Sequence, residues 1–388
     1  MLYYRFRPAG ELALKELLYD EVFLASSTEC NDPYDGVAFL SFGPERDKWQ
    51  RLFDLAWDKI YLPEKSTLVA GLVERVVADC PLTYTHGVEY DYESAIAKLF
   101  PSVTPIAGGL AQRVKSLLEL YRPRPPYFAS FSQSADNTLM WSHYASMHQG
   151  HCLVFRDLDG CLKQCPRRLR RSIQRSPSRG LAASMSYGVP TDFQFREVSY
   201  QDGTDALDAF ACLPSVVYGK ELAEADRIAL IESQQRQVLT KHIGWNYERE
   251  VRITFAPGAS WLFGEHLEFT PLERLIHFRP TQLVGVVMGA RMPADRQSRI
   301  REICKARLDR IAVDIGKYGV EEPLFDFVIF HAGLFNDRRD LSIKPTEVLS
   351  LSDRYGPEDE KFAERVERWR QGWALVFHGN GARKQQFI

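Results

Sequence analysis

The chain has 388 residues, of which 45% are hydrophobic and 26% are charged, and this composition excludes an intrinsically disordered protein. The formal net charge is -2 at pH 7, so attraction to nucleic acid or to a membrane surface has to come from a local patch. A chain of this length buries either one large core or two ordinary ones.

Cysteine usage and hydropathy give expectations about compartment and partners. The seven cysteines are odd in number and scattered, which predicts reduced thiols and no zinc or other metal site. The opening MLYYRFRPAG lacks the apolar segment of a signal peptide. No run of about 18 apolar residues predicts a membrane span. The sequence therefore predicts a cytoplasmic protein with no membrane partner.

Short strands and helices alternate along the chain, and a long helical stretch interrupts them. Hydrophobic periodicity separates the two kinds of element. Strands are predicted over 2–6, 21–26, 37–42, 126–132, 151–155, 196–200, 245–253, 282–289 and 325–330. Helices are predicted over 11–20, 137–148, 218–242, 294–308 and 357–373, and over most of 44–121.

This order of elements predicts an α+β fold, with a split or mixed antiparallel sheet and helices packed around it. Residues 1–43 and 126–334 form the predicted core, and residues 44–125 form a helical insertion. Residues 335–388 form a C-terminal extension of helix and strand. The segment 166–180 has six arginines, no acid and no apolar periodicity, which predicts a mobile loop.

The segment WNYEREVRI (245–253) carries two acids within an otherwise aromatic and β-branched run. As a strand it directs Glu248, Glu250 and Arg252 to one face. A solvated strand face with an arginine partner is one interpretation. The other is a buried acid pair, which needs positive partners, and Arg5 or Arg252 would serve.

Three segments together resemble an uncharacterised bacterial family known as domain of unknown function 2971. They are YRF followed by VFLASSTECNDPYDG, then FASFSQSADNTLMWSHYASMHQGHCLVF, then KHIGWNYEREVRI followed by LVGVVMGARMP. The resemblance covers roughly residues 1–43 and 126–320. The family name implies no activity, so the chemistry has to be inferred from individual residues.

The order of polar residues on the predicted strands resembles the arginine–serine–glutamate class of ADP-ribosyltransferases, which consume NAD. The order is Arg5, then Ser130 and Ser132, then Glu248 and Glu250. The resemblance implies that the arginine binds NAD and that the serines line the nicotinamide side of the cleft. It also implies that Glu250 is the main catalytic residue and that Glu248 acts on the acceptor, in roles suited to paired carboxylates.

Other polar residues are candidates for the same pocket. Asn31 and Asp32 lie in the NDPYDG turn and either shape that turn or hydrogen-bond the cofactor. His143 lies on a predicted helix with Trp141 and Tyr144, and it either packs in the core or reaches the pocket. Metal-dependent nuclease activity from Asp32, Asp35, His143 and Glu248 is a further alternative.

The arginine-rich segment is the strongest local charge asymmetry. Arg167, Arg168, Arg170 and Arg171 either form a solvated loop or contact nucleic-acid phosphates. The scarcity of aromatic residues in this segment favours backbone contact over base stacking. The sequence therefore predicts an ADP-ribosyltransferase-like enzyme with a protein or nucleic-acid acceptor, suited to a toxin or a phage-defence effector. A non-catalytic sensor that binds a ligand or nucleic acid is the alternative.

Overall fold

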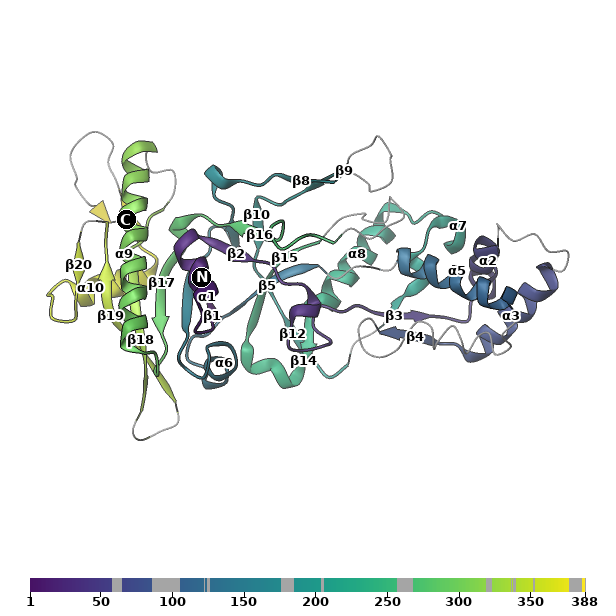
Figure 1. Ribbon diagram of the computed structural model, residues 1–388, viewed down its shortest axis with the longest axis horizontal. Helices are drawn as coiled ribbons and strands as arrows, with labels where there is room; N and C mark the ends of the chain where they lie inside the picture. The colour runs from purple at the N-terminus through teal and green to yellow at the C-terminus, as the bar shows by residue number, and fades with distance from the viewer. Residues whose placement is uncertain are drawn as a thin grey trace.

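The computed structural model describes residues 1–57, 65–85, 105–121, 123, 126–175, 185–203, 206–256, 268–318, 323–335, 337, 340–351, 353–376 and 386–387. The molecule is elongated. Figure 1 shows α2, α3 and α5 at one end and β18 to β20 with α9 and α10 at the other. None of the described helices is long and apolar enough to cross a membrane.

A nine-stranded mixed sheet forms the centre of the fold, which confirms the predicted α+β class. All of its pairings are antiparallel except that of β17 with β18. In spatial order the strands are β11 (Arg196–Glu197), β15 (Glu250–Phe255), β5 (Tyr127–Ser132), β1 (Leu2–Arg7), β6 (His151–Arg156), β17 (Leu283–Met288), β18 (Phe327–Leu334), β19 (Leu341–Leu349) and β20 (Arg354–Tyr355).

The sheet is split between β1 and β5. These two strands pair at a single position, Tyr4 with Ser132, whereas β1 pairs with β6 over its whole length and β5 does so with β15. Beyond that position β5 takes an isolated bridge from Ala25, which follows β2 (Glu21–Phe23). β1 and β5 therefore separate beyond this one pair, which leaves an opening in the sheet between them.

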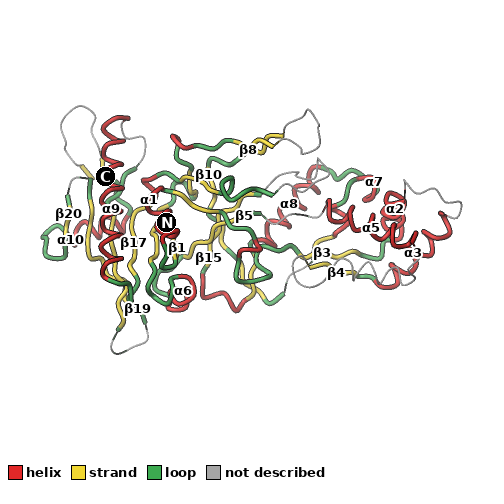
Figure 2. The backbone as a smooth tube through the Cα atoms, viewed as in Figure 1, coloured by secondary structure: helices red, strands yellow, loops and turns green. Residues whose placement is uncertain are grey.

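Alternation along the strands produces a hydrophobic cluster on each face of the sheet. One cluster contains Phe131, Val251 and Ile253 and is covered by α1 (Glu11–Tyr19) and α9 (Ala294–Tyr318). The other contains Phe6 and Val154 and is covered by α6 (Thr138–Tyr144) and α10 (Phe362–Gln371). The backbone tube in Figure 2 shows α9 and α10 against the strands at the C-terminal end.

A separate hydrophobic cluster lies in the helical part of the molecule. Its helices are α2 (Arg46–Trp57), α3 (Lys65–Asp79) and α5 (Pro105–Tyr121), and its strands are β3 (Phe39–Phe42) and β4 (Leu82–Thr85). The segment from β13 (Leu207–Asp208) to α7 (Ser215–Tyr218) completes it, although it is distant in sequence. Helices are thus present in the described parts of 44–121, and they pack against a later part of the chain. Residues 58–64 and 86–104 of the predicted helical stretch lie outside the described residues.

The C-terminal region belongs to the central sheet. The predicted border at residue 335 falls between β18 and β19, which pair along the length of β18. The aromatic face of α10 packs on the same cluster as α6, and Trp369 Nε1 donates a hydrogen bond to the Val284 carbonyl oxygen at 3.0 Å. Residues 340–376 therefore extend the sheet and cover one of its faces.

Several predicted elements are wrong in position. The predicted helix 218–242 is limited to α8 (Glu224–Val238), and its last residues form strand β14 (Thr240–His242). Residues 243–248 form a 3-10 helix, not the first half of a strand, and β15 begins only at Glu250. The predicted loop 166–180 contains a 3-10 turn (Pro166–Arg168) and β8 (Ser172–Arg175), which pairs with β9 (Met185–Gly188). Residues 176–180 lie outside the described part of the chain. Long-range partners supplied the hydrogen bonds for these elements, so local periodicity did not reveal them.

Candidate active site

A cleft of about 460 Å³ opens where β1 and β5 separate. Its walls come from β1, β5, α6, the loop before β3, β14 (Thr240–His242) and the 3-10 helix Ile243–Glu248. The residues proposed from the sequence that line it are Arg5, Asn31, Ser130, Ser132, His143, Glu248 and Glu250. Groups separated by more than two hundred residues thus meet in one cavity, of a size that suits a small molecule or cofactor.

A buried cluster of five charged groups forms one side of the cleft. Arg252 is fully buried and donates Nε to Glu250 Oε1 at 2.7 Å and Nη2 to Glu250 Oε2 at 2.9 Å. Its Nη2 also donates to Asp35. Lys241 Nζ lies 2.7 Å from Glu248 Oε2, 3.3 Å from Glu250 Oε2 and 3.5 Å from Asp35 Oδ2. Three carboxylates therefore surround two cations, which leaves one negative charge when all are ionised.

The two glutamates have different proton affinities. Burial raises the pKa of Glu248, and the Glu250 charge adds to this against the opposing effect of Lys241. Burial would also raise the pKa of Glu250, but the Arg252 guanidinium, with Lys241, outweighs it and lowers that pKa to about 2. Two neighbouring carboxyls with separated pKa values are suited to distinct roles in acid–base chemistry.

The low pKa of Glu250 predicts a pH-dependent contribution to stability. Its folded-state pKa of about 2 lies below the usual 4.5, so its contribution is fully present above that usual value and is lost as the pH falls toward 2. We expect wild type to exceed Glu250→Gln in unfolding free energy at about pH 7, with the difference shrinking by about pH 3. Urea unfolding of both proteins measures it. A difference independent of pH would contradict the assignment of this low pKa to Glu250.

The position of Glu248 corrects the prediction that it shares a strand face with Glu250. Arg249 between them has a left-handed backbone conformation, with φ of 44°, and this turn ends the 3-10 helix. Ser132 Oγ donates to the Glu248 carbonyl oxygen at 2.7 Å, and Asn137 Nδ2 donates to the Tyr247 carbonyl oxygen at 3.0 Å. Tertiary hydrogen bonds therefore hold Glu248 beside Glu250 without the alternation of a strand.

The two serines of β5 have different surroundings. Ser132 is buried and fixes the Glu248 turn, and its Oγ also accepts from the Ser134 backbone N–H at 3.1 Å. Ser130 is half-buried, lines the cleft and hydrogen-bonds to the Glu250 carboxylate. Both serines thus contact the acid pair, as neighbours across the β5–β15 pairing.

Arg5 does not pair with the acid cluster. Strand alternation directs it with Phe131 toward the α1 side of the sheet. There its Nε lies 3.0 Å from Glu16 Oε2, and its Nη1 donates to the Ser130 carbonyl oxygen at 2.9 Å. Arg5 reaches the cleft because β1 and β5 have separated, and its guanidinium is already bound by the protein.

Arg7 is a cleft residue that the sequence analysis missed. It lies two residues beyond Arg5 on the same strand face, its side chain is 25% exposed, and its Nε is 3.3 Å from Glu16 Oε2. No hydrogen bond joins its guanidinium to another described residue, and its buried Nε has no such partner. Arg7 is thus the arginine of this strand with donors available to a ligand.

The remaining candidates from the sequence divide between the cleft and its surroundings. Asn31 Nδ2 donates to the Tyr144 hydroxyl at 3.2 Å, and His143 is exposed at the cleft. Asp32 is buried, and its Oδ1 accepts from the Tyr34 backbone N–H at 2.9 Å. Asp32 therefore shapes the turn, as one interpretation predicted, and does not line the cleft.

Lys241 and Tyr144 complete the site, although the sequence analysis did not assign them a role there. The Tyr144 hydroxyl donates to Glu248 Oε1 at 2.6 Å, so the two oxygens of this carboxylate bind Tyr144 and Lys241. Burial lowers the proton affinity of Lys241, but the surrounding carboxylates outweigh it and raise its pKa. A buried acid pair requires positive partners. This requirement is the feature of the sequence that could have pointed to Lys241, which lies a few residues before the two acids.

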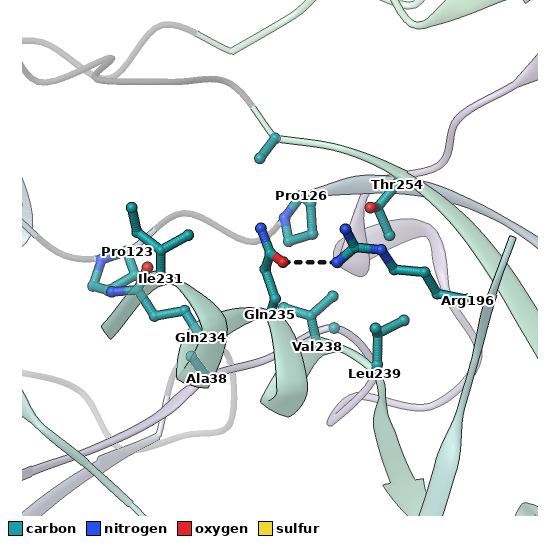
Figure 3. A pocket seen from close by; sticks show the side chains of 12 residues that line it. Ala38, Pro123, Pro126, Arg196, Ile231, Gln234, Gln235, Val238, Leu239 and Thr254 are labelled. Carbon is teal, nitrogen blue, oxygen red and sulfur yellow. Dashed lines mark hydrogen bonds between the residues drawn. The ribbon is translucent and has the colours of Figure 1, made fainter. Parts of the chain in front are cut away.

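The described part of the chain offers no cluster of metal ligands and has a further, smaller cavity beside β15. Its His, Cys, Asp and Glu side chains form no group of three or more that could hold a metal ion. A second, smaller cavity of about 120 Å³ lies between α8 (Glu224–Val238) and β15 (Figure 3), lined mainly by apolar groups. Its polar contact joins Arg196 Nη1 to Gln235 Oε1 at 2.7 Å.

Four arginines of the 166–180 segment, Arg167, Arg168, Arg170 and Arg171, lie outside the candidate active site. Arg167 and Arg168 line a different cleft against α9, and Arg170 Nη1 donates to the Leu272 carbonyl oxygen at 2.8 Å. Arg171 is exposed. These residues therefore do not contact a ligand bound between β1 and β5.

Comparison with known proteins connects the central part of the chain with one family. No curated protein and no solved structure matches the chain. A family model matches one segment, which runs from within α6 to within β15 and contains Tyr144, Lys241, Glu248, Glu250 and Arg252. Residues 140–253 match the family described as "Protein of unknown function (DUF2971)".

Proposed function

We propose that the chain cleaves the N-glycosidic bond of NAD and transfers the ADP-ribosyl group to a macromolecular acceptor. The observation that carries the proposal is the adjacency of β1, β5 and β15 in one sheet. The arginines of β1, the serines of β5, Glu250 of β15 and Glu248 just before it line a single cleft. This arrangement supports the resemblance of the Arg, Ser-x-Ser and Glu order to the arginine–serine–glutamate transferases.

The charge of the acid cluster suits the chemistry of this transfer. As the bond between ribose C1′ and the nicotinamide nitrogen breaks, its electron pair leaves with nicotinamide and positive charge develops on the sugar. The ionised Glu250 carboxylate stabilises that charge, and the excess of carboxylates over cations around it reinforces the effect. A new bond then forms between C1′ and the acceptor nucleophile.

Glu248 accepts the proton that the acceptor nucleophile loses. The pKa of Glu248 is raised toward neutral pH, and a general base works best when its pKa lies near the working pH. The Tyr144 hydroxyl and Lys241 orient it from opposite oxygens. Their hydrogen bonds fix the position of Glu248 beside Glu250 before a substrate enters.

Arg7 provides the guanidinium for the pyrophosphate of NAD in this proposal. A planar guanidinium binds phosphate oxygens through two parallel hydrogen bonds. Arg5 supports Arg7 in this task, because the two arginines together neutralise Glu16. The two arginines on one face of β1 thus have different tasks, with Arg5 structural and Arg7 facing the ligand.

Replacing Arg7 tests this division. We expect Arg7→Ala to weaken NAD binding roughly tenfold or more, because hydrogen bonds to charged groups contribute about 1.5–3 kcal/mol. Arg7→Lys keeps the charge but loses the fork, so its affinity is expected between those of wild type and Arg7→Ala. Titration calorimetry with NAD measures the affinity, and Arg75→Ala on an exposed face of α3 is the matched control. Equal affinity of Arg7→Ala and the control would remove Arg7 from the site.

The transferase activity is tested by incubating the protein with NAD that carries a label on its adenylate part, together with a cell lysate as the source of acceptors. The proposal predicts release of free nicotinamide and transfer of the label to macromolecules in the same sample. Nicotinamide release without macromolecular label would replace transfer by hydrolysis. Neither product, at any lysate concentration, would contradict the enzymatic proposal.

A non-catalytic binding module is the second candidate, and the burial of the acid cluster favours it. Glu250 is 4% exposed, and both of its oxygens bind Arg252. A carboxylate held in this way suits structural support of a ligand pocket as well as catalysis. NAD binding to the wild type with no release of nicotinamide would select this second candidate.

A further inference from the structure

A second large cleft lies beside α9, with a volume of about 770 Å³. One wall is the side of α9 (Figure 1) that carries Arg310, Asp314 and Tyr318, which recur at a spacing of four residues. The opposite wall is the 3-10 turn Pro166–Arg168, with Tyr19 from the end of α1. Two arginines of the arginine-rich segment, Arg167 and Arg168, line this cleft, and the proposed NAD chemistry does not use them.

Positive charge exceeds negative charge where three arginines pair with one buried aspartate at this cleft. Asp20 is fully buried at the end of α1, and its Oδ1 accepts from Arg307 Nε at 2.7 Å. Its Oδ2 lies 2.6 Å from Arg310 Nη2 and 3.4 Å from Arg168 Nη2. Three guanidinium groups thus share one carboxylate. The positive charge left over lies at the cleft, since the Arg310 and Arg168 side chains are 41% and 36% exposed.

Two exposed aromatic rings accompany these cations. Tyr318 is 52% exposed and Tyr19 is 48% exposed, and both line the cleft. The Arg167 guanidinium carbon lies 4.1 Å from the centre of the Tyr318 ring, and Asp314 Oδ2 fixes its Nη1 at 2.5 Å. The sequence analysis favoured backbone contact because the arginine segment itself lacks aromatics. The fold brings the Tyr318 ring beside Arg167, and it brings Tyr19 beside Arg168, whose Nη1 donates to the Tyr19 carbonyl oxygen at 2.6 Å.

We propose that this cleft binds a single strand of nucleic acid. Arg167 and Arg310 contact the phosphates, and a base stacks at Tyr318 beside the Arg167 guanidinium. Grooves that combine positive charge with aromatic platforms bind single strands with little sequence preference. The local excess of positive charge overcomes the formal net charge of -2 for the whole chain. This inference concerns a separate cleft and does not depend on NAD cleavage.

Fluorescence anisotropy with a labelled single-stranded oligonucleotide of about ten nucleotides tests the proposal on the full chain. We expect Tyr318→Ala to weaken binding about tenfold, in line with the loss of one stacked base. Arg167→Ala is expected to weaken it as well and to reduce the slope of log affinity against log salt by about one, since one phosphate contact is lost. Both side chains are about half exposed, so both variants are expected to fold.

Arg227→Ala is the matched control, because Arg227 is an exposed arginine that pairs with Glu224 and does not line the cleft. Its helix, α8, lies apart from α9 in Figure 1. This variant is expected to bind the strand like wild type. The proposal is overturned by no strand binding at low salt, or by equal affinity of the control and both cleft variants. Preference for duplex over single strand, or binding of free nucleotides without the strand, also overturns it.

Discussion

Glu250→Gln is expected to lower the rate of nicotinamide release by roughly 100- to 1000-fold, the cost of removing one electrostatic group aimed at developing charge. Gln preserves the size of the side chain, and its single amide oxygen accepts one of the two hydrogen bonds that Arg252 donates to Glu250. It removes the negative charge beside the sugar cation. The affinity for NAD is expected to change much less, because the charge develops only in the transition state.

The measurement is the rate of nicotinamide release at saturating NAD, with Glu197→Gln as the matched control. Glu197 is an exposed glutamate on β11, the strand next to β15, and it contacts Gln133 outside the cleft. The control is expected to keep the wild-type rate. An unchanged rate in Glu250→Gln would exclude this carboxylate as the catalytic group while leaving the fold and the cleft intact.

Arg252→Met is expected to destabilise the protein by about 3–5 kcal/mol, the usual result of removing one partner from a buried ion pair. The side chain is fully buried, and it neutralises Glu250 and Asp35 at once. It also donates Nη1 to the Val238 carbonyl oxygen at 2.8 Å and stacks 4.3 Å from the Phe128 ring centre. Met fills the apolar space but leaves both carboxylates with Lys241 as their remaining cation.

Urea unfolding measures the effect, and a double variant separates charge from packing. Adding Glu250→Gln to Arg252→Met removes one of the uncompensated carboxylates, so the double variant is expected to be more stable than Arg252→Met alone. Arg227→Met on the exposed face of α8 is expected to change stability little. Additive losses in the double variant would show that Arg252 contributes through packing instead of charge.

Most of the fold class and much of the cleft were predictable because they depend on local patterns. Strands β1, β5, β6 and β17 follow runs of aromatic and β-branched residues, and alternation along β15 places the buried Val251 and Ile253 opposite Arg252. Asn137 caps α6 through a local contact, because its side chain accepts from the Leu139 and Met140 backbone N–H groups. These features involve contacts between near neighbours in sequence.

The rest of the site depends on contacts that no local pattern encodes. The left-handed turn at Arg249, which separates Glu248 from the strand, is stabilised by partners more than a hundred residues away. The pairing of Arg5 with Glu16 required the packing of α1 on β1. Lys241 precedes the acids by a few residues, but only the approach of β14 to β15 makes it their shared cation.

The central claim is that NAD lies in the cleft where β1 and β5 separate, with its reacting sugar at Glu250. The most direct test is a crystal structure with an NAD analogue whose glycosidic bond resists cleavage. The account predicts the nicotinamide ribose in contact with the Glu250 carboxylate and the pyrophosphate at the Arg7 guanidinium. An analogue bound elsewhere, with the acid cluster facing only protein groups, would contradict it.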